Sequence, residues 1–150
     1  MTRKNPHAGL LKIRISQRDQ SVTVVQATQS QIQRLVERIE QLSGSITTWS
    51  EARKKLQAGV VKLQLWRENE AYRTELIEQK NELVQEFASL QERLHQERSI
   101  LLEHEKELKQ IEKIIEHHEA ARRSKDLAAE QAQLDEWAGL QARISRTTLP

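Results

Sequence analysis

The sequence predicts an all-α protein, a long antiparallel two-helix coiled coil (a helical hairpin) with a C-terminal helical overhang. Three observations predict this fold. Glu, Gln, Leu, Lys, Arg and Ala dominate the 150 residues, and aromatic residues make up only 3%. Only two prolines occur, Pro6 and Pro150, so nothing between them forces a helix to end. Apolar residues recur at alternating spacings of three and four, the pattern by which one helix packs along another.

The first helix is predicted over about residues 8–57 of a single coiled-coil domain that covers 1–150. Asn5 can cap this helix, and Pro6 suits its first position. We call the stripe that faces the partner helix the seam. Around residues 22–28 the apolar spacing slips, which predicts a local bend or looser packing. The seam of the first helix comprises Ile32, Leu35, Ile39, Leu42, Ile46, Trp49, Arg53, Leu56, Val60 and Leu63.

A turn is predicted at about residues 58–63, where Gly59 tolerates turn geometry. The first seam, continued past Leu63, reaches position 77, whereas the second seam uses 76, so the two do not join into one rod. If the chain folds back near residue 61, the sequence numbers of two residues that face each other across the hairpin add up to about 122. This register places Arg53 opposite Asn69, polar against polar. The remaining pairs are Leu56 with Trp66, Ile39 with Leu83, Leu35 with Phe87, Ile32 with Leu90, and Leu11 with Ile111.

The second helix is predicted over about residues 64–145, and its seam ends near Ile115. Because the first helix begins near Ala8, its partner stretch ends near Ile114. About 30 residues are then left over, which makes about 45 Å of single helix. Apolar residues on this overhang have no predicted partner in the chain, so we expect them to bind another protein. They are Leu127, Leu134, Trp137 and Ile144.

Charge is divided unevenly along the chain. Residues 1–58 hold ten of the 24 Lys and Arg but only four of the 22 Asp and Glu, which leaves 14 and 18 for residues 59–150. A hairpin sets the basic half against the acidic half, whereas a parallel dimer sets like against like. The sequence therefore predicts a monomer in isolation. A homodimeric structural or tethering coiled coil is the alternative.

Residues that carry chemistry are few. Cysteine is absent, and only Glu92 and His95 form a Glu-x-x-His pair, whereas di-iron bundles need two such pairs. Two paired helices form no cleft, and no phosphate-binding loop occurs. We therefore expect no metal, no cofactor, no catalytic residues and no small-molecule substrate. Aromatic residues do not interleave with the basic residues of the first helix, which argues against nucleic-acid binding.

Three stretches follow one another along the chain: LLKIRISQRDQ, QAGVVKLQLWRENEAYRTELIEQ and QLDEWAG. In their order and spacing the chain resembles the FliJ/YscO family, the stalk components of bacterial type III export machines, and is most similar to the flagellar FliJ branch. It implies a non-enzymatic cytoplasmic protein, peripheral at the inner face of the bacterial cell membrane. Such a protein inserts into the hexameric export ATPase, contacts the membrane-embedded export gate and escorts export chaperones. The residues alone leave flagellar and injectisome systems as alternatives.

The resemblance also assigns roles to individual positions, because its acidic-aromatic C-terminal motif matches residues 135–138 and its gate-binding face lies near the turn. The residues expected to bind the ATPase ring are Leu11, Arg14, Leu127, Leu134, Asp135, Glu136, Trp137 and Ala138. The residues expected to bind the export gate are Leu42, Trp49, Tyr72 and Leu76.

Overall fold

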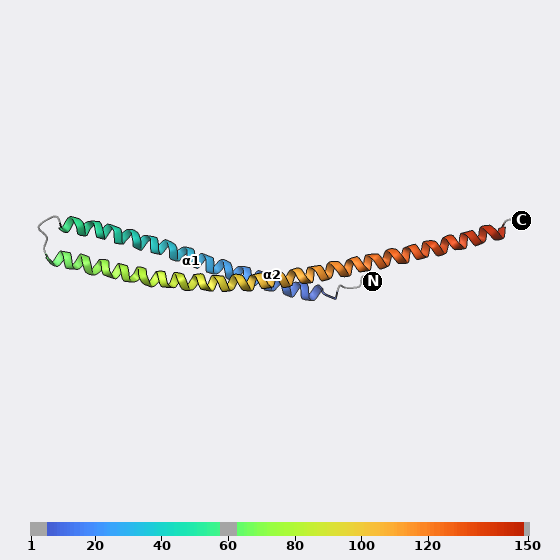
Figure 1. Cartoon of the computed structure of the whole chain (residues 1–150), viewed down its shortest axis with the longest axis horizontal. Helices are drawn as coiled ribbons and strands as arrows, with labels where there is room; N and C mark the ends of the chain where they lie inside the picture. Colours follow the sequence, from blue (N-terminus) through green and yellow to red (C-terminus); the bar gives the residue numbers. More distant parts are fainter. Residues whose placement is uncertain (1–5, 58–62, 149–150) are drawn as a thin grey trace. The chain divides into compact units, whose positions relative to one another are not determined.

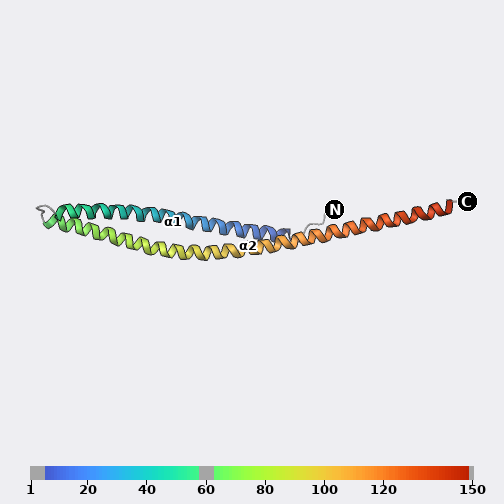
Figure 2. The same cartoon turned by 45° about the horizontal axis from the view of Figure 1, so that its top comes forward.

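The computed structural model of the chain describes residues 6–57 and 63–148. Two helices account for nearly all of them: α1, Ala8–Gln57, and α2, Leu63–Thr148. The described residues contain no strand. Figures 1 and 2 show the two helices packed side by side and running in opposite directions. The predicted helical hairpin is confirmed. Of the predicted turn, residues 58–62 lie outside the described residues, and Leu63 is the first residue of α2.

The helices contribute to two compact units. The hairpin unit consists of Gln17–His104, and the terminal unit consists of Met1–Ser16 together with Glu105–Pro150. Each unit contains a part of both helices. Neither helix, over the residues that the structure describes, has a stretch long and apolar enough to span a membrane.

The core of the hairpin unit is the seam between its two helices. Leu35 and Leu42 of α1 and Leu76 of α2 are buried there, as predicted. The seam also continues toward the start of the unit through Thr28, Val25 and Ser21, at the same alternating spacings of three and four, and all three are buried. The seam is therefore continuous through residues 22–28, where the apolar spacing slips. Two of these seam positions are polar, so a search for apolar spacing passes over them.

Two polar layers of the seam are hydrogen-bonded across the two helices. Thr28 Oγ1 donates a 2.6 Å hydrogen bond to Glu97 Oε2, while Arg93 Nε donates to the other carboxylate oxygen at 2.9 Å. Ser21 Oγ and His104 Nδ1 are hydrogen-bonded at 2.6 Å. A buried polar group needs such a partner because it has lost water. The partner numbers add to 125 in both layers, close to the 122 that the sequence predicts.

The terminal unit holds the first turns of α1 against α2. Leu11 is half-buried, and α2 contributes the buried Leu108 and Ile111. Arg14 Nη1 lies 2.6 Å from Glu107 Oε2, so an ion pair ties the two helices together. The rings of His7 and His118 meet edge to face, with centroids 6.2 Å apart. This part of α2 is therefore packed against α1.

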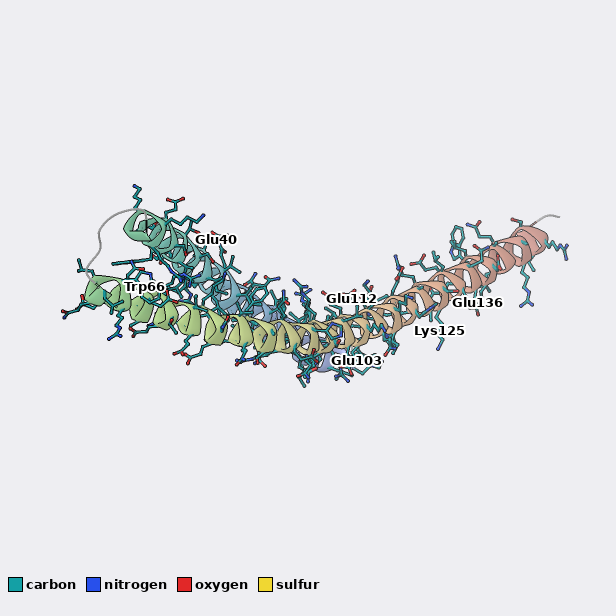
Figure 3. The ribbon with its side chains drawn as sticks, turned by 60° about the vertical axis from the view of Figure 1, so that its left-hand side comes forward. Glu40, Trp66, Glu103, Glu112, Lys125 and Glu136 are labelled. Carbon is teal, nitrogen blue, oxygen red and sulfur yellow. The ribbon has the colours of Figure 1, made fainter. Side chains whose placement is uncertain are left out.

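The rest of the terminal unit is the overhang, residues 119–148 of α2. Every side chain from 119 to 147 is exposed. In Figure 3, Lys125 and Glu136 stand on a stretch of α2 with no second ribbon beside it. The sequence explains where pairing stops: continued past Ile115, the seam of α2 meets His118, Arg122 and Lys125. The charged Arg122 and Lys125 cannot be buried between two helices without partners.

Candidate partner-binding surfaces

The overhang carries a stripe of large apolar side chains that face water. Singly exposed apolar residues are ordinary, but a continuous stripe marks a binding surface. The exposed fractions are 66% for Leu127, 60% for Leu134, 60% for Trp137, 51% for Leu140 and 61% for Ile144. Leu127 and Leu134 are seven residues apart, as are Trp137 and Ile144, so the four recur on one side of the helix. We call them, with Leu140, the overhang stripe.

The acidic residues next to Trp137 lie on other faces of the helix. Successive residues of an α-helix are turned by about 100°, so Glu136 lies about 100° and Asp135 about 200° from Trp137. Gln131 Nε2 donates a 3.1 Å hydrogen bond to Asp135 Oδ1, one turn away along the same face. Ala138 is exposed on the far side of Trp137. The motif at 135–138 thus offers a partner an apolar face and a separate acidic face.

Leu11 and Arg14 are placed differently from the other residues predicted to bind the ATPase ring. Leu11 is half-buried in the packing of α1 on α2, and Arg14 is paired with Glu107. These two residues hold the base of the overhang and are not part of its exposed surface. The other six, from Leu127 to Ala138, are exposed on it.

A second exposed surface lies in the hairpin unit, near the ends of the helices that face the turn. The rings of Trp49 and Tyr72 lie 4.8 Å apart at an interplanar angle of 56°. They are 37% and 46% exposed, and we call them the aromatic pair. Leu42 and Leu76, predicted with them, are only 3% and 6% exposed. A partner at this face can therefore touch the aromatic pair, while the two leucines belong to the core.

Charged and polar side chains link α1 and α2 close to the aromatic pair in the sequence. Arg53 lies over the Trp66 ring, 5.3 Å from its centroid, and its Nη1 is 3.1 Å from Glu70 Oε2. Arg73 Nε donates a 2.9 Å hydrogen bond to Ser50 Oγ. Asn69 is buried in the layer that the sequence predicts, but the carboxylate partner of Arg53 is Glu70, one residue further along. A long arginine side chain reaches past its own layer.

Residues 6–147 match the family model of the flagellar FliJ protein, which is most of the chain. The chain belongs to the FliJ family. Comparisons with curated proteins and with solved structures found no match. Membership of the FliJ family makes the chain a protein of flagellar type III export, so the flagellar alternative holds over the injectisome one.

The histidines of this FliJ-family chain lie in different settings, and the rings of His7 and His118 are in contact. His104 is half-buried in the seam with Ser21, while His95 and Glu92 are exposed. Within residues 6–57 and 63–148, no three histidine or acidic side chains come together in a way that could hold a metal ion. The chemistry of the described surface is that of apolar and charged contacts.

Two features of the FliJ-family chain were missed at the level of sequence. Leu140, at the flank of the overhang stripe, follows Trp137 by three residues, and this helical spacing could have revealed it. The polar layers of Ser21 with His104 and Thr28 with Glu97 could have been found by counting the seam backward from Ile32 without regard to polarity.

Proposed function

We propose that the chain is a non-enzymatic stalk of the flagellar export apparatus, whose overhang inserts into the hexameric export ATPase. The observation that carries the proposal is the exposed overhang stripe on a part of α2 that α1 does not cover. A ring of subunits can surround a single helix, whereas a flat surface would cover one side only. Within the overhang stripe, Leu140 lies beside the other four residues and widens the apolar surface. A surrounding ring can contact this wider surface from more than one side.

The size of the stripe fits a complex that can exchange. Full burial of one large apolar side chain contributes about 1.5–3 kcal/mol. Association costs about 4–15 kcal/mol in lost freedom of motion. Burial of Leu127, Leu134 and Trp137 with their neighbours is therefore of the same order as this cost, so the net affinity is modest. In the proposal Asp135 and Glu136 face the ring from the other sides of the helix, and Leu11 and Arg14 brace its base.

We place the export gate at the aromatic pair. Trp49 and Tyr72 offer two adjoining rings that are partly exposed, and aromatic side chains are favoured anchors in interfaces. Leu42 and Leu76 are buried in the seam, so in the proposal they stabilise the hairpin at this site and do not touch the gate. Because the gate is a membrane protein, the chain would act in the cytoplasm, peripheral at the inner face of the bacterial cell membrane. Escort of export chaperones would be an added role.

Binding of the purified chain to its hexameric export ATPase tests the proposal. Trp137→Ala should weaken this binding by at least about tenfold, because one large anchor is lost. Lys125→Ala, which truncates a long side chain on the side of the overhang opposite to the stripe, is the matched control. Circular dichroism should show the same helicity for both variants. Equal affinity of the Trp137→Ala variant and the parent would overturn the proposal.

A homodimeric tether built on the whole seam has less support. The hairpin unit buries its seam between α1 and α2 of one chain. A parallel dimer would have to break the hydrogen bonds of Glu97 and His104 and set each residue against its own copy. The overhang stripe, by contrast, is exposed.

A further inference from the structure

The overhang stripe is part of a second seam. Leu127, Leu134, Trp137 and Ile144 fall into alternating spacings of three and four when Glu130 and Gln141 are counted with them. The seam of the paired region, continued at its own spacing, would instead use Ala129, Ala132 and Glu136. The two seams are therefore out of phase. A narrow seam of this kind is buried by packing against another helix.

This second seam is complementary to itself when a copy runs in the opposite direction. If each residue is set opposite the one whose number brings the total to 271, Leu127 meets Ile144 and Leu134 meets Trp137. Glu130 meets Gln141, so the carboxylate can accept a hydrogen bond from the amide nitrogen. Every apolar residue thus meets an apolar one, and each polar residue meets a polar one.

Other arrangements lack this match. A shift by one heptad places Glu130 opposite Leu134, which leaves a carboxylate in an apolar layer. A parallel pair in register places Glu130 opposite its own copy, and two buried carboxylates repel each other. We propose that the overhangs of two copies pair antiparallel through the second seam, with Leu134 and Trp137 at the centre.

Charge and space permit this pairing. From residue 131 to 147 the flanks of the seam are uncharged, and the charged residues lie mostly on the outer side. The flanking residues are Gln131, Gln133, Ala138, Leu140, Ser145 and Thr147. The overhang holds five basic and five acidic residues, so two overhangs do not repel as wholes. These are Arg122, Arg123, Lys125, Arg143 and Arg146, with Glu119, Asp126, Glu130, Asp135 and Glu136.

The start of α1 does not obstruct the pairing. His7, just before α1, packs beside His118 of α2. In each copy the first layer of the proposed pair, Leu127, lies nine residues past His118. The layers from 127 to 144 therefore pair without overlapping α1 of either copy.

The pairing has a regulatory consequence that rests on the proposed function. Leu134 and Trp137 cannot be buried in a second copy and in an ATPase ring at once. Dilute chains are then monomers with an open stripe, and concentrated chains are dimers that mask it until a ring competes for the overhang.

Sedimentation velocity of the full chain, from about 5 to about 500 μM, tests the pairing. The chain should show a reversible monomer–dimer equilibrium across this range, since the affinity of a few apolar layers is modest. Leu134→Glu and Trp137→Glu should each weaken it by at least about tenfold. Ala132→Glu introduces the same charge on the outer face and should leave it unchanged. A monomer at every concentration, or a dimer indifferent to both core changes, would overturn the proposal.

Disulfide cross-linking tests the register, and the absence of native cysteine makes it clean. A mixture of Leu127→Cys and Ile144→Cys chains should form a mixed disulfide, because these positions face each other. Each variant alone should not cross-link, since its two cysteines would lie about 25 Å apart along the pair. Efficient cross-linking of Leu127→Cys alone would indicate a parallel pair and refute the register.

Adding the hexameric export ATPase to the dimer separates the two proposals. Loss of dimer upon addition supports masking. A hexamer that binds while the dimer persists refutes masking. If the hexamer does not bind at all, the proposed function and the masking fail together, while the sedimentation and cross-linking results still decide the pairing.

Discussion

Leu35, Leu42 and Leu76 of the hairpin unit are at most 8% exposed, whereas Leu127, Leu134 and Trp137 of the overhang are at least 60% exposed. All six occupy positions at heptad spacing. Heptad spacing indicates that one side of a helix is suited to burial, but it does not indicate which partner buries that side. In the hairpin unit the partner is α1 or α2 of the same chain. On the overhang these side chains are exposed, and the binding proposed above takes their partner from another molecule.

Polar residues show the same contrast. In the hairpin unit Thr28 and Glu97 share a hydrogen bond, so their layer is satisfied inside one chain. Glu130 and Gln141 occupy the corresponding kind of position on the overhang and are exposed. A polar residue in a seam selects its partner more strictly than an apolar one, because a wrong neighbour leaves it without a hydrogen bond.

The hairpin unit and the overhang should differ most when a large apolar side chain is truncated, as judged by the free energy of unfolding. Leu42→Ala should lower the free energy of unfolding by about 2–5 kcal/mol, because it leaves a cavity in the seam. Leu134→Ala on the overhang should change it by less than about 0.5 kcal/mol, as exposed positions do. Thermal and urea unfolding followed by circular dichroism measure both. A comparable loss in the two variants would mean that the overhang is packed in the free chain.

A smaller effect is expected at the polar layer. Thr28→Val should lower stability by about 1–3 kcal/mol, because Glu97 loses a hydrogen bond inside the seam. The double variant Thr28→Val with Glu97→Leu replaces both polar groups by apolar ones and should recover most of this loss. Urea unfolding of the four members of this cycle gives the coupling. If the two single variants change the free energy of unfolding additively, Thr28 and Glu97 are not coupled.

Loss of an ion pair in the terminal unit should lower the free energy of unfolding by a still smaller amount. Arg14→Ala removes a half-exposed ion pair with Glu107 and should lower stability by no more than about 1 kcal/mol. The loss should appear as faster amide hydrogen exchange in residues 8–16, with little change in the hairpin unit. Lys12→Ala, a change at an exposed position nearby, is the control. Equal exchange in both variants would show that the ion pair does not hold the start of α1.

The aromatic pair should give the smallest change in stability and a clear change in binding. Trp49→Ala should leave the free energy of unfolding within about 1 kcal/mol, since its ring is partly exposed. Affinity for the export gate should fall by about tenfold if the pair is the anchor proposed above. Titration calorimetry with the cytoplasmic part of the gate measures it, with Thr48→Ala as the control. An unchanged affinity would show that the export gate does not bind at the aromatic pair.

Much of the fold follows from spacing and counting. The mirrored seams predict the hairpin, and the difference in helix length predicts the overhang. The polar layers escaped prediction because Ser21 and Thr28 look like surface residues until their partners are known. Leu42 and Leu76 were expected at a gate-binding face, yet a leucine in the seam is buried by the opposite helix first. The proposed partners of the exposed surfaces are other molecules, so the sequence of this chain does not determine them.

The ion pair of Arg14 with Glu107 stands close to the point where α2 becomes solitary. If the first two turns of α1 were to fray, the uncovered length of α2 would grow by about 11 Å. The length of α2 that projects as a single helix thus depends on how firmly the start of α1, more than one hundred positions earlier in the chain, stays packed against α2.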